Sequence, residues 1–324
     1  LYPVNAISVL NVTVPKSMCL KIETKDSTVL IDPGIAAEVD SFPLPEYQRI
    51  LLHDRYRRRI VDSAKDSDAI VVTHYHYDHH ICERDRSLYG NKLLLLKDPE
   101  RFINKSQRVR AANFLETIQG LPKRIRVADG RRIKIGGTKI SFSKALWHGV
   151  EGTSLGYVIM VKIEEGGEKL LYSSDVNGLT LKKSTDLIVA ENPNHLILDG
   201  PPTYLLGYIM AYYNLARSVI NVRRLLEETS IETIVFDHHL ARDYRFPDLL
   251  YEAYRKAGEL NKTLCTAAEL QGKKPVVLEG YRKNGPTRWR SWKKFEKKDA
   301  ADVLRNAVRN RLVGGEWLKM LERY

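Results

Sequence analysis

The sequence predicts an α/β protein with two β-sheets and helices on their outer faces. In each half of the chain, short apolar runs separated by turn residues are followed by apolar runs that alternate with helical segments. Antiparallel meanders are typical of the first pattern, and parallel strand–helix units are typical of the second. The 324-residue chain, which is 43% hydrophobic and 28% charged, is long enough to bury the cores of such a fold.

The first half begins with strand-like runs and ends in hairpins. Strands are expected over residues 6–14, 18–24, 27–31, 70–72, 92–96, 131–135, 139–146, 154–163 and 169–173. Helices are expected over residues 49–64, which are basic and amphipathic, and over residues 100–118. Gly136, Gly137 and residues 164–168 supply turns, so the last strands of this half are expected to pair as hairpins.

The second half alternates strands with helices. Buried strands are expected over residues 187–190, 195–198 and 233–236. Helices are expected over residues 211–228 and 247–260, the second with Pro247 in its first turn. Arg242 and Asp243, between a strand and a helix, are expected to form a local ion pair.

Positive charge is concentrated at the C-terminal end. The net charge is +12, and residues 273–324 contain 15 Lys or Arg against 6 Asp or Glu, so nine of the twelve net charges lie there. We therefore predict a main domain, residues 1–272, and a basic extension, residues 273–324, docked through an amphipathic helix over 299–312. Residues 288–298 mix six cations with three aromatic residues, a combination that binds nucleic acid. Aromatic rings packed on the domain beneath solvated cations explain this composition equally well.

The strongest functional signal follows the strand expected at residues 70–72. His74, His76, Asp78 and His79 are four possible metal ligands within six positions, and residues 74–80 hold four of the nine histidines of the chain. Imidazole and carboxylate groups bind zinc, iron or manganese. A solvated loop or a chance tract is a weaker explanation of this clustering.

Further candidate ligands follow other expected strands. His148, Asp175, His238 or His239, and Asp32 each lie just beyond an apolar run, where α/β folds gather their active sites. If the strand continued through His238 and His239, their side chains would point to opposite faces, so only one of them would bind a metal. His239 would then be a substrate contact, a proton donor or an exposed residue. Asp199 also ends a strand and is expected to orient a ligand or to contact the substrate.

Together these residues resemble the five motifs of the metallo-β-lactamase superfamily over residues 5–270. The motifs follow in order as Asp32, His74-x-His76-x-Asp78-His79, His148, Asp175 and His238. The sequences Asp237-His238-His239 and Leu198-Asp199-Gly200-Pro201-Pro202 resemble a largely archaeal branch of predicted metal-dependent hydrolases.

The resemblance implies an αββα sandwich with two divalent metal ions at the sheet edge, most simply zinc, with manganese or iron as alternatives. One metal would be held by His74, His76 and His148, and the other by Asp78, His79 and His238. Asp175 would bridge the two metals, and Asp32 would orient ligands from behind. A hydroxide between the metals would then be the nucleophile, with Asp78, Asp175 and His239 as the catalytic side chains.

The sequence therefore predicts a metal-dependent hydrolase of a phosphodiester or of a small ester, lactone or thioester. The alternative is a ribonuclease, or another nucleic-acid-processing or nucleic-acid-binding protein, that uses residues 288–324. Cys19, Cys82 and Cys265 are widely spaced, which predicts free thiols and a cytoplasmic location. No apolar run approaches the roughly 20 residues that span a bilayer, so no membrane association is expected.

Overall fold

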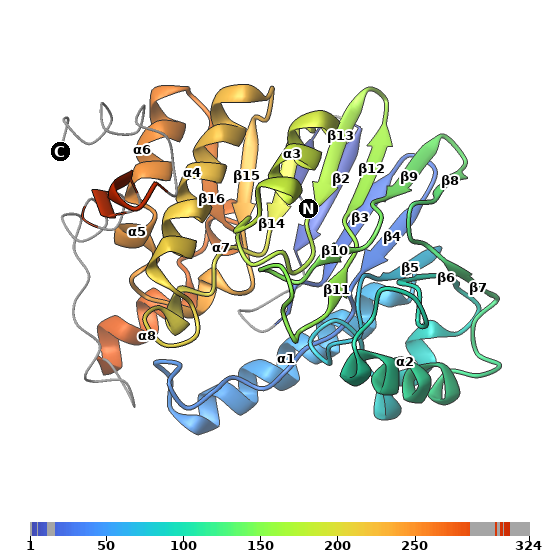
Figure 1. Ribbon diagram of the computed structural model, residues 1–324. Coiled ribbons are helices and arrows are strands. Elements are labelled where there is room, and N and C mark those ends of the chain that lie inside the picture. Colours follow the sequence, from blue (N-terminus) through green and yellow to red (C-terminus); the bar gives the residue numbers. More distant parts are fainter. Residues whose placement is uncertain are drawn as a thin grey trace.

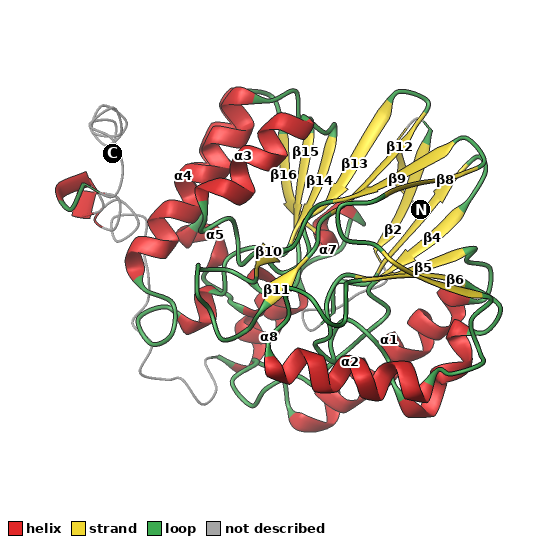
Figure 2. Ribbon diagram, turned by 45° about the vertical axis from the view of Figure 1, so that its right-hand side comes forward, coloured by secondary structure: helices red, strands yellow, loops and turns green. Residues whose placement is uncertain are grey.

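The computed structural model describes residues 2–4, 6–11, 17–285, 302, 305–306 and 308–311. Within these residues the chain forms two mixed β-sheets of seven strands each, a two-stranded hairpin, and helices on the outer faces of the sheets (Figures 1 and 2). The α/β fold class predicted from the sequence is confirmed.

The first sheet contains the N-terminal strands in sequence order. These are β1 (Tyr2–Val4), β2 (Ile7–Asn11), β3 (Leu20–Thr24), β4 (Thr28–Ile31), β5 (Ala69–Val72), β6 (Leu93–Leu96) and β7 (Arg124–Val127). Strands β1 to β4 pair antiparallel and β4 to β7 pair parallel. The parallel strands are connected through α1 (Glu46–Ala64), the 3₁₀ segment η1 (Glu83–Tyr89) and α2 (Lys105–Thr117).

The second sheet has the order β16-β15-β14-β13-β12-β9-β8. Its strands are β8 (Arg132–Ile135), β9 (Thr138–Phe142), β12 (Val161–Glu165), β13 (Glu168–Tyr172), β14 (His195–Leu198), β15 (Thr233–Phe236) and β16 (Thr263–Thr266). Strands β13 to β16 are parallel, and a separate hairpin of β10 (Leu146–Trp147) and β11 (Tyr157–Val158) precedes β12. The remaining segments are α3 (Lys182–Glu191), η2 (Thr203–Leu205), α4 (Tyr212–Glu228), η3 (Leu240–Arg242), α5 (Phe246–Leu249), α6 (Tyr251–Glu259), α7 (Ala267–Leu270) and α8 (Val276–Asn284).

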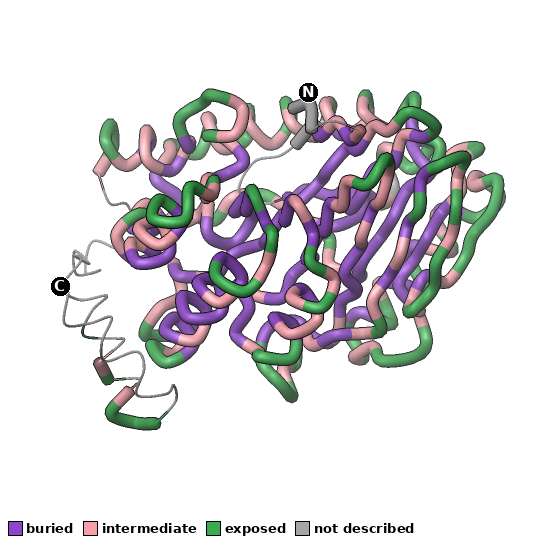
Figure 3. The backbone as a smooth tube through the Cα atoms, turned by 90° about the horizontal axis from the view of Figure 1, so that it is seen from above, coloured by how far each residue is buried: buried purple, intermediate pink, exposed green. Residues whose placement is uncertain are grey.

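Three apolar cores hold the layers together. Because side chains alternate along a strand, Ala69 and Val71 of β5 pack in the core between the sheets, while Ile70 and Val72 pack in the core that holds Phe114 of α2. The third core joins the second sheet to α3, α4 and α6. Figure 3 shows the strands as the buried centre and the connecting loops as the exposed rim. The layers are helix, sheet, sheet and helix, the αββα sandwich that the resemblance implied.

Several sequence-based boundaries differ from the structure. Residues 187–190 were expected as a strand, but they lie in α3, where Ser184, Thr185 and Ile188 form one buried face at helical spacing. A four-residue apolar run is typical of a strand and of a buried helix segment alike, so the run by itself does not distinguish the two. The expected strands over 139–146 and 154–163 are each interrupted, which produces the β10–β11 hairpin. The edge strands β1, β7 and β16 were missed.

The predicted boundary at residue 272 falls just before α8. Val277 of this helix is buried in the same core as Leu215 of α4, and Tyr281 stacks on Tyr244 with ring centroids 3.6 Å apart. Residues 288–298, and most of the helix expected over 299–312, lie outside the described residues, so the division into two domains stays a prediction. No helix in the described part of the chain combines the length and apolar character needed to cross a membrane.

Candidate metal centre

Possible metal ligands from both sheets meet at the edge where the strands end. Asp32 follows β4 and His74 follows β5 in the first sheet, while Asp175 follows β13 and His238 follows β15 in the second. His148 follows β10 of the separate hairpin. In the first sheet β4 pairs with β5 in parallel, and in the second sheet β13 pairs with β14 and β14 with β15 in parallel. This pairing keeps the carboxyl ends of these strands at one edge of each sheet.

The backbone bends sharply at three of these strand ends. Asp32, Ser174 and His238 have positive φ values of 47°, 54° and 47°. Residues other than glycine rarely adopt this left-handed conformation, which costs about 1–3 kcal/mol at each position. Such strain is typical of functional sites, and here it occurs at the residues that bring the candidate ligands together.

Asp175 lies at the centre of the cluster. Its Oδ2 atom is 3.8 Å from Nε2 of His74, 3.2 Å from Nε2 of His79, 3.3 Å from Nε2 of His148 and 3.5 Å from Nε2 of His238. One carboxylate oxygen therefore faces four imidazole nitrogens, in a position from which it could bridge two cations.

The candidate ligands form four overlapping groups in the described part of the chain. Ligand atoms of His74, His76, His148 and Asp175 all lie within 4.8 Å of one another, and so do those of Asp78, His79 and His238. The same holds for Asp32, His74 and His79, and for Asp175, His238 and His239. Within the described part of the chain, the buried atoms Nε2 of His74, Nε2 of His148 and Oδ1 of Asp175 have no hydrogen-bond partner. Buried polar atoms are normally satisfied, and cations would satisfy these. The cluster is therefore compatible with a dinuclear metal site.

The protonation states of three candidate ligands suit metal binding. Burial, reinforced by His148, lowers the pKa of His76 to about 3, and burial lowers the pKa of His74 well below its usual value. Burial alone would raise the pKa of Asp78, but His79 and His238 outweigh it and lower that pKa to about 2. Neutral imidazoles and ionised carboxylates are the forms that bind metals.

Asp32 holds His79 in place from behind. Its Oδ1 accepts the backbone N–H of Thr73 at 2.7 Å, and its Oδ2 accepts the hydroxyls of Thr73 at 2.5 Å and Tyr172 at 2.8 Å. Oδ2 also lies 2.9 Å from Nδ1 of His79, so Nε2 of that ring is directed toward Asp175. Burial would lower the pKa of His79, but the carboxylates of Asp175 and Asp32 outweigh it and raise the pKa well above its usual value.

Both His238 and His239 lie at the site, because the strand does not continue through them and the opposite faces expected of a continuous strand do not apply. Strand β15 ends at Phe236, and the left-handed backbone at His238 breaks the alternation, so the two rings lie with centroids only 4.3 Å apart. Nε2 of His238 is 3.4 Å from Oδ2 of Asp78. Nδ1 of His239 instead faces Oδ2 of Asp199 at 3.3 Å.

Asp199 connects His239 to the loop that carries Asp175. Its carboxylate accepts the backbone N–H groups of Asn177 at 2.6 Å and Gly178 at 3.2 Å. Burial, reinforced by the charge of Asp175, raises the pKa of Asp199 well above its usual value. The carboxyl group thus fixes the Asp175 loop and one nitrogen of His239 at the same time.

Sequence reasoning missed the position of Arg242. Its expected ion pair with Asp243 does not form, because Asp243 pairs with a neighbouring arginine. Nη2 of Arg242 lies 3.3 Å from Nε2 of His238 and 3.7 Å from Oδ2 of Asp78, and Nη1 donates to the hydroxyl of Tyr204 at 2.8 Å. No local sequence signal indicates this contact, since Tyr204 is 38 positions away.

The histidines that were not expected to bind metal lie apart from this cluster. His80 packs on Phe114 with ring centroids 4.9 Å apart, on the side of β5 that faces α2. His195 lies 3.7 Å from Glu168 and is buried at the opposite end of β14.

Several known proteins are similar to this chain. The sequence model of the family described as "Metallo-beta-lactamase superfamily" matches residues 13–80. Over 272 residues the chain is 39% identical to a UPF0282 protein of Korarchaeum cryptofilum, covering 83% of this chain and 89% of that protein. It is 37% identical over 272 residues to a UPF0282 protein of Metallosphaera sedula, covering 83% and 87%. Among solved structures, the metallo-beta-lactamase fold protein YhfI from Bacillus subtilis matches 77% of this chain and 88% of its own, with 13% identity and a TM-score of 0.43.

Proposed function

Because this chain belongs to the UPF0282 proteins of the metallo-beta-lactamase superfamily, we propose that it is a metal-dependent hydrolase with a dinuclear centre. The observation that carries the proposal is the position of Asp175. Its Oδ2 atom lies 3.2–3.8 Å from ring nitrogens of four buried histidines that come from three segments of the chain. A structural zinc site needs only four ligands, so this larger set favours two metals and catalysis.

Two of the candidate ligand groups support the division of ligands between two metals that the sequence suggested. In this proposal His74, His76 and His148 would hold one cation, Asp78, His79 and His238 would hold the other, and Asp175, between the two sets, would serve as a ligand as well. Nitrogen and carboxylate donors suit zinc, with manganese or iron as alternatives. When bound, two such cations lower the pKa of a water nucleophile and stabilise negative charge on the group under attack.

The protein side chains orient these ligands and move a proton. Asp32 fixes the His79 ring through Nδ1, an interaction that orients a ligand and makes it more basic. We assign proton transfer to the leaving group to His239, whose Nδ1 is held by Asp199 and whose ring lies beside His238. The contacts of Asp32 with His79 and of Asp199 with His239 hold the two imidazole rings in fixed orientations during the reaction.

Arg242 favours an anionic substrate. Its guanidinium is buried beside Asp78 and His238 and brings a positive charge to the ligand cluster. That charge would neutralise a phosphodiester or a carboxylate-bearing ester better than it would assist a neutral lactone. Binding of nucleic acid through residues 288–324 stays a prediction, since most of this segment lies outside the described residues.

Metal stoichiometry and hydrolysis measured together test the proposal. The purified protein is loaded with zinc, manganese or iron and assayed on phosphodiester, thioester, ester and lactone substrates. We expect about two metals per chain. We expect Asp175→Asn to lose metal and to slow hydrolysis by more than about 100-fold, because even residues behind the ligands cost 10–100-fold.

Asp54→Asn is the matched control, because Asp54 is exposed on α1 and lies outside the candidate ligand groups. This variant should keep the metal content and the hydrolysis rate of the wild type. A folded wild-type chain that holds less than about one metal, or an Asp175→Asn variant that hydrolyses as fast as the wild type, would contradict the proposal.

A further inference from the structure

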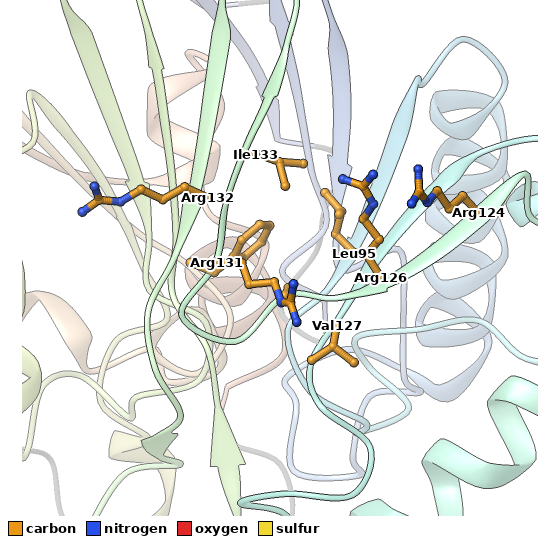
Figure 4. A pocket seen from close by; sticks show the side chains of 9 residues that line it. Leu95, Arg124, Arg126, Val127, Arg131, Arg132 and Ile133 are labelled. Carbon is orange, nitrogen blue, oxygen red and sulfur yellow. The ribbon is translucent and has the colours of Figure 1, made fainter.

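A second concave site lies at the open edge of the sandwich, where the edge strands β7 and β8 of the two sheets approach each other (Figure 4). The pocket has a volume of about 530 Å³, and none of the candidate metal ligands lines it. Its lining residues are Leu95, Arg124, Arg126, Val127, Ala128, Arg131, Arg132, Ile133 and Phe142.

Four exposed arginines give this pocket an uncompensated positive charge. Within the described part of the chain, the guanidinium groups of Arg124, Arg126, Arg131 and Arg132 form no ion pair or hydrogen bond, and the pocket lining contains no carboxylate. Asp129, in the turn between the two pairs, is already engaged, because its carboxylate contacts the buried Nζ of Lys97 at 2.7 Å.

The four arginines come together from different sheets. Arg124 and Arg126 are two positions apart on β7, so they share one face of the first sheet. Arg132 begins β8 of the second sheet, and Arg131 directly precedes it. In Figure 4, Arg126 and Arg131 flank Leu95, and Arg124 and Arg132 lie farther out on either side.

The floor of the pocket is apolar. Leu95 and Ala128 are fully buried and Phe142 is nearly so, while Val127 and Ile133 are half-buried. The pocket thus combines an apolar floor with a cationic rim. Its volume lies in the range of about 300–1,000 Å³ that is usual for small-molecule sites.

We propose that this pocket binds a nucleotide-sized ligand through its phosphate groups. Arginine presents a planar fork of N–H donors that pairs with two phosphate oxygens at once, and two or more arginines can share a diphosphate. The ring portion of such a ligand would cover Leu95, Ile133 and Phe142. Residues of β6, β7, β8 and β9 line this pocket, whereas the candidate metal ligands follow β4, β5, β10, β13 and β15.

Protection of exposed sheet edges is the competing explanation of these charges. Both β7 and β8 are edge strands, and charged side chains on edge strands prevent pairing between molecules. That role needs only positive charge, which lysine supplies equally well. It does not require four guanidiniums around one pocket, and Arg→Lys substitutions therefore separate the two explanations.

Calorimetric titration of the metal-loaded protein with ADP, and separately with inorganic pyrophosphate, tests the proposal. We expect saturable binding that weakens at higher salt, and at least a tenfold loss of affinity in the double variant Arg126→Lys/Arg131→Lys. The control double variant Arg55→Lys/Arg58→Lys, on exposed positions of α1, should bind as the wild type does. Asp175→Asn should also bind ADP normally, which distinguishes this pocket from phosphate capture at the metal centre.

Three results would overturn the proposal. The first is no binding of either probe by the wild type. The second is unchanged affinity in the Arg126→Lys/Arg131→Lys variant, which would leave edge protection as the explanation. The third is binding of a 12-residue oligoribonucleotide that depends on these arginines while ADP and pyrophosphate fail to bind, which would indicate a nucleic-acid surface instead.

Discussion

Replacing Asp32 by asparagine should weaken metal binding without changing the size of the side chain. Four donors surround this carboxylate: the backbone N–H of Thr73 at Oδ1, and the hydroxyls of Thr73 and Tyr172 together with Nδ1 of His79 at Oδ2. An amide has only one oxygen, so its NH₂ group must face some of these donors.

The orientation of the new amide follows from which donors can adapt. An NH₂ group facing the Thr73 N–H would leave a buried clash of donors that costs about 1–3 kcal/mol. At the other position the two hydroxyls can rotate to accept, and His79 can accept if its proton moves to Nε2. That proton would then occupy the nitrogen that faces Asp175 at 3.2 Å.

The expected loss of metal affinity is about 10–100-fold, as is usual for residues that orient metal ligands, or about 1.4–2.7 kcal/mol. Competition with a chromogenic chelator at fixed pH measures this loss, and circular dichroism checks the fold. Tyr172→Phe is the control, because it removes one hydroxyl but keeps the carboxylate beside His79, and its metal affinity should stay close to that of the wild type. A folded Asp32→Asn protein with wild-type affinity at both metals would refute the reasoning.

Two further substitutions test the support around the site. An added Cβ at Gly34 would lie 2.2 Å from the backbone nitrogen of His80, so Gly34→Ala should displace the histidine segment and lower the metal content measured by mass spectrometry. Gly258→Ala in α6 is the control, because the added Cβ meets nothing within 4 Å. We expect the Gly258→Ala protein to keep its metal and the Gly34→Ala protein to lose it. Equal metal content in the two variants would contradict this prediction. Asp129→Asn removes the anionic partner of the fully buried Lys97 and should lower the free energy of unfolding by about 3 kcal/mol in urea denaturation. A decrease in the free energy of unfolding below about 0.5 kcal/mol would mean that the backbone carbonyls of Asp98 and Arg101, which accept hydrogen bonds from Nζ of Lys97, stabilise this ammonium group without Asp129.

The parts of the fold that sequence reasoning found are those with local signals. The β-branched run at residues 69–72 marks β5, and polar residues directly after apolar runs mark the strand ends that carry Asp32, His148 and Asp175. Parallel strands end at one edge of a sheet, so these residues could be expected together before any distance was known.

The parts that sequence reasoning missed depend on contacts between distant segments. Strand β7 reads Arg-Ile-Arg-Val and has no buried residue, so it lacks the apolar signal of an interior strand. The arginine pocket exists only because β7 and β8 belong to different sheets whose edges meet. Likewise, Arg242 reaches the metal centre through the fold and not through its neighbours in sequence.

The division of the ligands between the sheets has a consequence for stability. His74, His76, Asp78 and His79 follow a strand of the first sheet, whereas Asp175 and His238 follow strands of the second. A complete candidate site therefore exists only while the two sheets are packed, so metal binding there would be thermodynamically linked to sheet packing. Bound cations would act as reversible cross-links between the halves of the sandwich, and the core between the sheets is in effect part of the binding site.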